Sequence, residues 1–445
     1  MCIRDRAHSL GFAALVFILG EGGFTTRWAD LKASLSLAGL LATVGVVVSV
    51  ALVAAFCHLA LGMPLPSAVL MGAVTAPTDS AAVFSVLRGL PLPARVRSVL
   101  EGESGLNDAP IVLLVSAATA WSLGELPEGG PAVVVAMIVV ELVGGVLIGA
   151  IVGLVGGRLL RSLALPASGL YPLAAMAVAV FAYGFGVWLH VSGFAAVYVA
   201  AVILGNTQLL HRNATRSFAE GIGWVAQIGL FVMLGMLANP EKLTGFMVVQ
   251  GLVIGAFLTF VARPLAVFVC SVWFRVPWRE QAFISWAGLR GAVPIIMATV
   301  PLAAGAPDAA ITFEEVTVFV VVFTLVQAPT LPWVARKLGI ADAVDPVDIE
   351  VEVAPLDRIQ ADFMQIRVPA GSRLHGVTIK ELRLPRLTVI ALILRDGQPI
   401  VPGVLDRINE GDELMVVVPS ARRQEVEDLF AAIGRGGRLA GWFEG

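Results

Sequence analysis

Charged residues are scarce in this chain. Asp, Glu, Lys and Arg make up 14% of its 445 residues, whereas hydrophobic residues make up 58%. Because soluble domains carry about 25% charged residues, this composition indicates a polytopic membrane protein and not an enzyme. The net charge of −3 gives no indication of a nucleic-acid partner.

Cysteine and a clear export signal are also lacking. The three cysteines are Cys2, Cys57 and Cys270. The last two lie in apolar runs, so they predict small buried side chains and not a disulfide framework or a zinc site. The polar start shows no signal-peptide pattern. We therefore expect residues 1–9 to be an artefactual or disordered start of an N-terminally truncated chain.

Apolar runs long enough to span about 30 Å of hydrocarbon recur through most of the chain. They predict eleven transmembrane helices in an all-α domain over residues 10–336. Pro77 interrupts the third run and Pro294 the tenth. The runs lie at 10–26, 33–60, 66–87, 98–121, 131–156, 170–189, 193–206, 219–238, 244–271, 280–302 and 312–335.

The loops between these runs differ in charge. If the end of the last helix lies in the cytoplasm, the inner loops hold 13 Lys and Arg residues and the outer loops hold only Lys242. This asymmetry follows the positive-inside rule. It favours an odd number of helices in the cytoplasmic membrane, with a cytoplasmic carboxyl terminus.

The composition changes after the last apolar run. An acidic linker over 337–358 precedes short runs rich in Val, Ile and Leu, which predict strands at 363–368, 388–394 and 413–418. Asp396-Gly397 supplies turn chemistry, and Ser420 would cap a helix through Phe430. We expect a small cytoplasmic α/β domain over 359–435, followed by a tail over 436–445.

The third run contains Thr78 and Asp79 directly after Pro77. Proline removes a backbone donor and disfavours helix at the residue before it, so the helix is expected to break here. Carbonyls freed at such a break can bind a cation, as transporters use near the midplane. The alternative is a kink at which Asp79 only caps the following half-helix.

The fourth run begins with the most polar stretch in the membrane domain, Glu101 to Pro110. Glu103 and Asn107 are four residues apart and share a helix face, with Ser104 and Asp108 beside them. A buried carboxylate that binds either H⁺ or a monovalent cation is sufficient for exchange. Asn107 adds no second titrating charge, so one-for-one, electroneutral exchange at Asp108 is predicted. A satisfied structural carboxylate is the alternative.

Two arginines within apolar runs need partners, because an unpaired buried charge is costly. Glu103 is the natural partner of either Arg263 or Arg290. The glycines and Pro294 around Arg290 predict a second broken helix, where the cation could offset negative charge. Alternatively, both arginines only lock helices together. Glu21 is a weaker candidate, either lining the cation path or lying in water at a helix end.

These motifs together resemble the NhaP-type monovalent cation:proton antiporters. The likeness covers residues 10–336 and rests on Thr78-Asp79, Glu103-Ser104-Gly105-Leu106-Asn107-Asp108, Arg263-Pro264 and Gly288-Leu289-Arg290-Gly291-Ala292-Val293-Pro294.

The resemblance implies a thirteen-helix fold with inverted repeats, two helices of which would be missing here, and a homodimer. It implies an ion site formed by Thr78, Asp79, Ser104 and Asp108. It also implies that Glu103 pairs with Arg263.

The tail is similar to the carboxy-terminal regulatory domain of potassium-conductance regulators, the TrkA-C or RCK-C domain. The likeness rests on residues 368–372, on Leu374-His375-Gly376 and on Gly411-Asp412-Glu413-Leu414. Such a tail implies K⁺ in preference to Na⁺, and binding of a small ligand or nucleotide.

We therefore predict a K⁺ or Na⁺/H⁺ antiporter that works by alternating access and needs no cofactor. The transported K⁺ or Na⁺ is the only metal expected. A cation channel gated by the tail is the first alternative, although the chain has no filter sequence such as Thr-Val-Gly-Tyr-Gly. A non-transporting membrane sensor is the second.

Overall fold

The computed structural model describes residues 2–79, 82–83, 90, 92–125, 130–163, 165–207, 209, 211–237, 241, 243–340, 350–356, 361–369, 371–395, 397–419 and 422–436. The chain divides into two compact units, residues 1–343 and 344–445. The acidic linker residues 341–349, Ser420 and the predicted tail from 437 onward lie outside the described residues.

The first unit is helical, and each of the eleven predicted apolar runs contains helix. Six described helices are long and apolar enough to cross a membrane, and four shorter apolar helices accompany them. The helices are α1 (Cys2–Thr25), α2 (Trp28–Leu40), α3 (Val46–Leu59), α4 (Leu65–Thr75), α6 (Ala94–Ser122), α7 (Gly130–Ser162), α8 (Leu170–Trp188), α9 (Gly193–Asn206), α10 (Arg212–Leu237), α11 (Gly245–Phe257), α12 (Arg263–Ser271), α13 (Trp278–Trp286), α14 (Ala292–Ala304) and α15 (Ala309–Lys337).

Two predicted spans are helix pairs joined by a π-helical turn. The turn η1 (Leu41–Gly45) connects α2 to α3, and η3 (Leu258–Ala262) connects α11 to α12. A short 3₁₀ turn, η4 (Val272–Phe274), follows α12. Single π turns inside helices occur frequently at functional sites. Here η3 ends at the residue before Arg263, one of the two membrane arginines.

Both predicted helix breaks are present. Helix α4 ends at Thr75, and residues 76–79 have no helical structure. The second break runs from Ala287 to Gly291, between α13 and α14. The expectation that Pro294 interrupts the helix is wrong: Pro294 lies in the first turn of α14, where a missing N–H costs nothing. The glycine-flanked segment before it makes the break.

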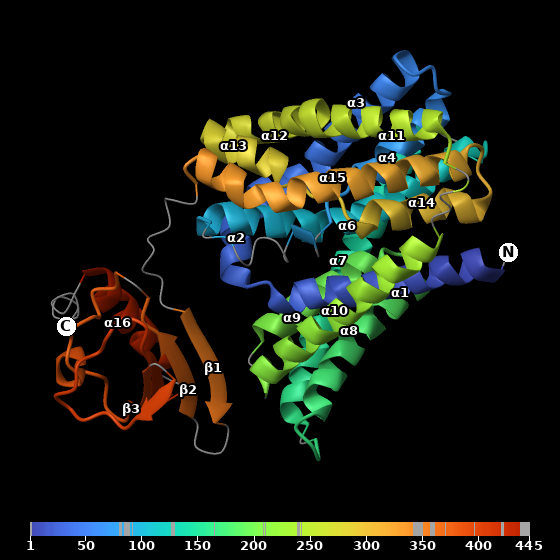
Figure 1. The fold of residues 1–445 in the computed structure, drawn as a ribbon. Coiled ribbons are helices and arrows are strands. Elements are labelled where there is room, and N and C mark those ends of the chain that lie inside the picture. The colour runs from blue at the N-terminus through green and yellow to red at the C-terminus, as the bar shows by residue number, and fades with distance from the viewer. Residues whose placement is uncertain are drawn as a thin grey trace. The chain divides into compact units, whose positions relative to one another are not determined.

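The helices of this unit form two groups (Figure 1). Helices α1, α7, α8, α9 and α10 pack on one another, whereas α2, α3, α4, α6 and α11 to α15 form the second group. Helix α6 contacts α7 and α9, and α14 contacts α1 and α10, so these helices join the groups. The two helix breaks belong to the second group.

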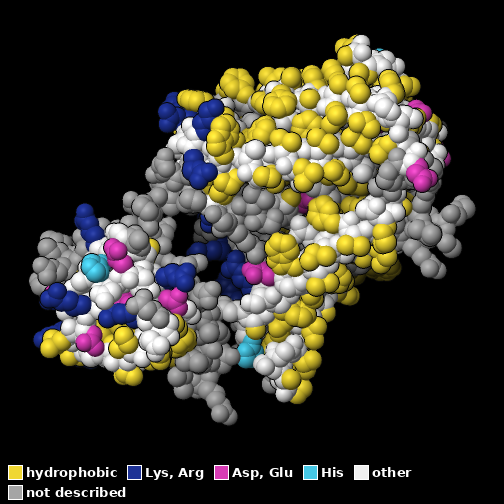
Figure 2. Space-filling view, in the orientation of Figure 1, with side chains coloured by type: hydrophobic (Ala, Val, Ile, Leu, Met, Phe, Trp, Pro, Cys, Tyr) yellow, Lys and Arg dark blue, Asp and Glu magenta, His cyan; other side chains and the backbone are white. Residues whose placement is uncertain are grey.

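The surface of the helical unit is broadly apolar (Figure 2). Helix α7 exposes large side chains such as Val135, Val140 and Leu147, as expected for a helix that faces lipid. Several of its glycines face α9 instead: a side chain at Gly153 would come within 3.0 Å of the Ala200 backbone. Membrane helices approach closely at such small residues.

The start of the chain differs from the prediction. Helix α1 begins at Cys2, so residues 2–9 are helical and not disordered; that they are an artefactual start stays a prediction. Leucine, alanine and phenylalanine continue the helix from residue 10, and the preceding residues extend it without a proline or a glycine.

The second unit is a five-stranded antiparallel sheet in the order β1-β2-β5-β3-β4, with one longer helix. The strands are β1 (Glu350–Leu356), β2 (Ala361–Arg367), β3 (Val389–Arg395), β4 (Gln398–Ile400) and β5 (Glu413–Pro419); the helices are the 3₁₀ turn η7 (Ile379–Leu382) and α16 (Arg423–Gly436). The three predicted strands are present to within two residues. Gly397 has a φ of 75° in the β3–β4 turn, so the predicted turn is confirmed at its described residue.

Strand β1 was not predicted, because it lies in the segment interpreted as linker. It pairs along its whole length with β2, from Glu350 opposite Arg367 to Leu356 opposite Ala361. The alternation Glu350-Val351-Glu352-Val353 has the period of a half-buried strand. The acidic composition of the surrounding segment concealed that period.

Candidate ion-exchange site

The two broken helices are joined by hydrogen bonds to backbone carbonyls. The N–H of Asp79 in the first break donates to the carbonyl of Leu289 in the second, at 2.8 Å. The Nε atom of Arg290 donates to the carbonyl of Thr75, the last residue of α4, at 2.9 Å. The breaks therefore fix one another's position inside the helical unit.

Asp79 connects both halves of the crossing. One carboxylate oxygen, Oδ2, accepts the N–H of Ala292 at 2.7 Å, and Oδ1 accepts that of Ala82 at 3.4 Å. Asp79 thus lies at the N-terminus of α14, where the helix dipole stabilises a negative charge. Gly291 permits this approach, since a Cβ atom there would collide with the Asp79 carboxylate. Asp79 therefore caps the segment that follows it, as the alternative interpretation expected. It also caps α14 on the other side of the crossing.

Arg290 places a positive charge at the C-terminus of a helix, whereas Asp79 places a negative charge at an N-terminus. Its buried guanidinium donates to the carbonyls of Thr75 and Gly288, both at 2.9 Å. Helix α4 ends at Thr75, and a cation there stabilises the negative end of the helix dipole. The carbonyl of Arg290 accepts a hydrogen bond from Thr324 of α15 at 2.8 Å. Arg290 therefore offsets negative backbone charge and also ties three helices together.

Thr78 links the first break to α6. Its Oγ1 atom lies 3.2 Å from the hydroxyl oxygen of Ser104 and accepts a hydrogen bond from the Asn107 amide nitrogen at 2.7 Å. All three side chains are buried. The structure thus brings Thr78, Ser104 and Asn107 into one polar cluster. In the sequence, Thr78 directly precedes Asp79 and Asn107 directly precedes Asp108.

Asp108 differs from every other member of this cluster. Its side chain is only 3% exposed, and neither carboxylate oxygen has a hydrogen-bond partner among the described residues. The Oδ1 atom of Asn107 also lacks a partner within that part of the chain. Buried polar atoms are nearly always paired. The unpaired oxygens on these adjacent residues are therefore candidate ion ligands.

Glu103 of α6 has partners for both of its oxygens. Both its oxygens accept hydrogen bonds from Arg263 of α12, one of them at 2.8 Å from Nη2. Nη2 also donates to the carbonyl of Ile284 in α13, at 3.3 Å. The glutamate and the arginine are both buried. They form a two-pronged ion pair that leaves Glu103 without a free oxygen, unlike Asp108.

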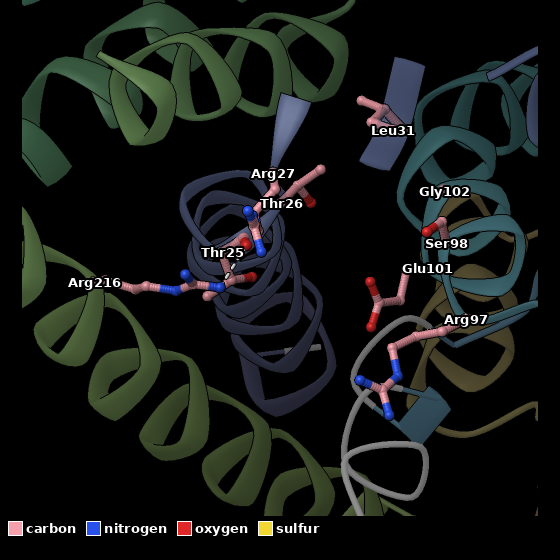
Figure 3. A pocket seen from close by; sticks show the side chains of 9 residues that line it. All are labelled: Thr25, Thr26, Arg27, Leu31, Arg97, Ser98, Glu101, Gly102 and Arg216. Carbon is pink, nitrogen blue, oxygen red and sulfur yellow. Dashed lines mark hydrogen bonds between the residues drawn. The ribbon is translucent and has the colours of Figure 1, made fainter. Parts of the chain in front are cut away.

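A cavity of about 230 Å³ opens beside the start of α6 (Figure 3). Glu101 points into it from α6, with the Arg97 guanidinium close by (Figure 3). Glu101 precedes Asp108 by seven residues, two helical turns, so both lie on the same face of α6. The cavity thus lies about two helical turns along α6 from Asp108, and its lining includes three arginines. Its lining is Thr25, Thr26, Arg27, Leu31, Arg97, Ser98, Glu101, Gly102 and Arg216.

Glu21 lies apart from the cluster. It is buried on α1, where it packs against Gly223 of α10; a side chain at Gly223 would come within 2.8 Å of it. The expectation that it lies in water at a helix end is wrong.

Sequence reasoning missed two polar residues of interest. Tyr198 of α9 packs on Gly105, where an added Cβ would lie 2.9 Å from its hydroxyl oxygen. Glu315 of α15 is buried. It was inside the eleventh predicted run but was not singled out. The signal was available: Glu314 and Glu315 are adjacent carboxylates in an apolar helix.

Known proteins match the chain over both units. Residues 7–337 match the family described as sodium/hydrogen exchanger, transmembrane, and residues 363–431 match the TrkA-C domain. The K(+)/H(+) antiporter NhaP of Alkalimonas amylolytica is 34% identical over 437 residues, which cover 96% of this chain and 74% of that protein. The K(+)/H(+) antiporter NhaP2 of Shewanella oneidensis is 32% identical, with the same coverage.

A solved structure shares the fold. The sodium proton antiporter MjNhaP1 from Methanocaldococcus jannaschii superimposes with a TM-score of 0.65 at 21% identity, covering 75% of this chain and 87% of that one. The helix breaks and the polar cluster on α6 therefore occur in a known antiporter architecture. The chain belongs to the sodium/hydrogen exchanger family and carries a TrkA-C domain.

Proposed function

We propose that this protein exchanges H⁺ for a monovalent cation, preferentially K⁺, and that Asp108 carries both ions in turn. The observation that carries the proposal is the Asp108 carboxylate, which is buried and has no hydrogen-bond partner among the described residues. A bare charge in such a place costs several kcal/mol. Binding of either H⁺ or a cation removes that cost, so the two ions compete for one site.

The remaining members of the cluster suit cation binding. The hydroxyls of Thr78 and Ser104 and the free amide oxygen of Asn107 supply neutral oxygen ligands close to Asp108. Asp79 contributes negative charge while its oxygens hold the N-terminus of α14. Both Na⁺ and K⁺ accept oxygen ligands, so the preference for K⁺ rests on the named activity of the relatives and on the TrkA-C domain.

The geometry also supports electroneutral exchange by alternating access. Glu103 is neutralised by Arg263 and remains so whichever ion is bound. With one titrating carboxylate, one H⁺ leaves as one cation enters. We propose that the helix group containing the breaks moves against the group formed by α1 and α7 to α10, and exposes Asp108 to each side in turn.

The assembly and its placement are part of the same proposal. The chain acts as a homodimer in the inner membrane, with the TrkA-C domain in the cytoplasm. The exchanger covers residues 10–336 and the regulatory domain 350–435, because β1 pairs with β2 and so shortens the linker predicted over 337–358. That domain binds a small ligand or nucleotide and adjusts the exchange rate.

Proton flux in proteoliposomes tests the proposal. Wild-type protein should move H⁺ when K⁺ is added, more slowly with Na⁺, and at a rate independent of membrane potential. Asp108→Asn should remain folded and lose exchange. Glu141→Gln is the matched control, because Glu141 is a half-buried membrane carboxylate on α7, outside the cluster. Exchange that persists in Asp108→Asn would overturn the proposal.

A further inference from the structure

A second buried carboxylate lies far along the chain from the exchange site. Glu315 of α15 is 1% exposed, and neither of its oxygens has a hydrogen-bond partner among the described residues. An ionised side chain at the centre of a membrane helix costs about 3 kcal/mol even on the mildest scale. Burial of this carboxyl group without a hydrogen-bond partner makes Glu315 a candidate proton-binding group.

The contact around Glu315 is unusually close. A Cβ atom at Gly251 of α11 would lie 2.7 Å from the Glu315 carbonyl oxygen. One turn further, Gly255 faces the rings of Phe319 and Phe323 on α15. Glycines four residues apart bring membrane helices together in this way. The backbone of Glu315 is therefore packed tightly against α11, so a rearrangement around the Glu315 side chain acts on a closely packed helix pair.

The described titratable groups that interact with Glu315 carry no positive charge. Cys57 of α3 and Asp308 at the start of α15 lie close enough to interact with Glu315 electrostatically. Glu314 is its neighbour on the helix. Helices α4, α11 and α14, which pack on α15, contain no titratable side chain. Helix α13 carries Arg279 and Glu280, and Arg279 lies against Gly339, beyond the opposite end of α15.

The two helices that meet at Glu315, α11 and α15, are also connected to the two arginines of the site. Helix α15 binds the carbonyl of Arg290 through Thr324, at 2.8 Å. Helix α11 continues through η3 into α12, where Arg263 pairs with Glu103. A shift of α11 against α15 therefore displaces one arginine relative to the other. A change in the protonation of Glu315 can therefore affect the positions of Arg263 and Arg290 through these contacts.

We propose that Glu315 is a second proton-binding site, separate from the exchange site, and that its ionisation loosens the α11–α15 contact and changes the exchange rate. The ligand is H⁺, and this proton regulates exchange but is not transported. The proposal rests on the proposed antiport function. Two adjacent carboxylates make an internal comparison available, because Glu314 is 9% exposed and has other interactions.

The test is the pH dependence of K⁺-driven proton flux in proteoliposomes containing the full chain. Glutamine mimics the protonated side chain, so Glu315→Gln should keep the maximal rate and the one-for-one stoichiometry. The alkaline side of its rate profile should be displaced by about one pH unit or more, because the contact stays closed. Glu315→Asp should keep a titrating response, and Glu314→Gln should follow the wild-type profile.

Infrared difference spectroscopy supplies a readout that a purely structural role would not produce. A buried protonated carboxyl band should vary with pH in the wild type and be missing in Glu315→Gln. An unchanged profile in Glu315→Gln, an equal shift in Glu314→Gln or a changed stoichiometry would overturn the proposal. Asp108→Asn separates the two hypotheses: persistent exchange there refutes the antiport site, whereas a normal Asp108 result with an unshifted Glu315→Gln refutes only this one.

Discussion

The ion pair between Glu103 and Arg263 allows a quantitative prediction. Both residues are buried, and the pair contains two charge-assisted hydrogen bonds between α6 and α12. Replacing one partner strands the other charge, which costs about 3–5 kcal/mol of folding free energy. We therefore expect Glu103→Gln and Arg263→Met each to lower the midpoint of thermal unfolding in detergent strongly. The double variant should recover part of the loss, with a coupling energy of about 0.5–3 kcal/mol.

The pair between Arg216 and Glu220 on α10 provides the control. Its atoms lie 3.7 Å apart, and the side chains are 44% and 34% exposed. An exposed pair of this kind contributes at most about 0.5 kcal/mol. Glu220→Gln should therefore barely change the unfolding midpoint. If Glu103→Gln and Glu220→Gln destabilise the protein equally, or if the double variant shows no recovery, burial of the Glu103 pair does not have the consequence assigned to it.

Three further predictions concern both units. Gly291→Ala should displace the Asp79 carboxylate from the Ala292 N–H and raise the KM for the cation without altering a titrating group, because that hydrogen bond contributes about 1.5–3 kcal/mol; cation-dependent flux measures it. Thr78→Val should raise the KM up to tenfold, and Thr78→Ser, which keeps the hydroxyl, should not. In the TrkA-C domain, burial opposes ionisation of Asp412, but hydrogen bonds from Arg395 and the Asn409 N–H outweigh it and hold the pKa of Asp412 below its ordinary value. Its contribution to stability is therefore present above about pH 4 and lost as the pH falls through the folded-state pKa. Hydrogen exchange of β5 in the full chain should be faster in Asp412→Asn than in wild type at pH 7, and the difference should disappear as the pH falls through the folded-state pKa of Asp412.

Much of the fold could be predicted because membranes impose simple rules. Eleven apolar runs correspond to helix, since only a helix satisfies its own backbone in hydrocarbon. Both breaks could be predicted from glycine, proline and charge within those runs. The second was placed at Pro294, but proline is accommodated in a first turn, and the flanking glycines of Arg290 determine the break.

Contacts between distant segments could not be predicted from residue types alone. The sequence shows that Asp79 follows a proline, but not that it caps α14, which begins 213 residues later. The residue types show two arginines and several carboxylates, but they do not decide whether Glu103 pairs with Arg263 or with Arg290. Glu315 lies outside the recognised motifs. What distinguishes it is that its carboxylate oxygens have no hydrogen-bond partner among the described residues, and this depends on how the helices pack.

The crossing explains why Asp108, among several buried carboxylates, is suited to carry a changing charge. Asp79 lies against the positive end of α14, and Arg290 lies against the negative end of α4. Glu103 is matched by Arg263. Each of these charges is compensated by a partner that is present in every step of a transport cycle. The charge of Asp108 has no such partner among the described residues, so only an ion from solution can compensate it. The fixed charges of Asp79 and Arg290 thus hold the two broken helices in place, and in the proposed function Asp108 is compensated by an ion that arrives and departs with each exchange.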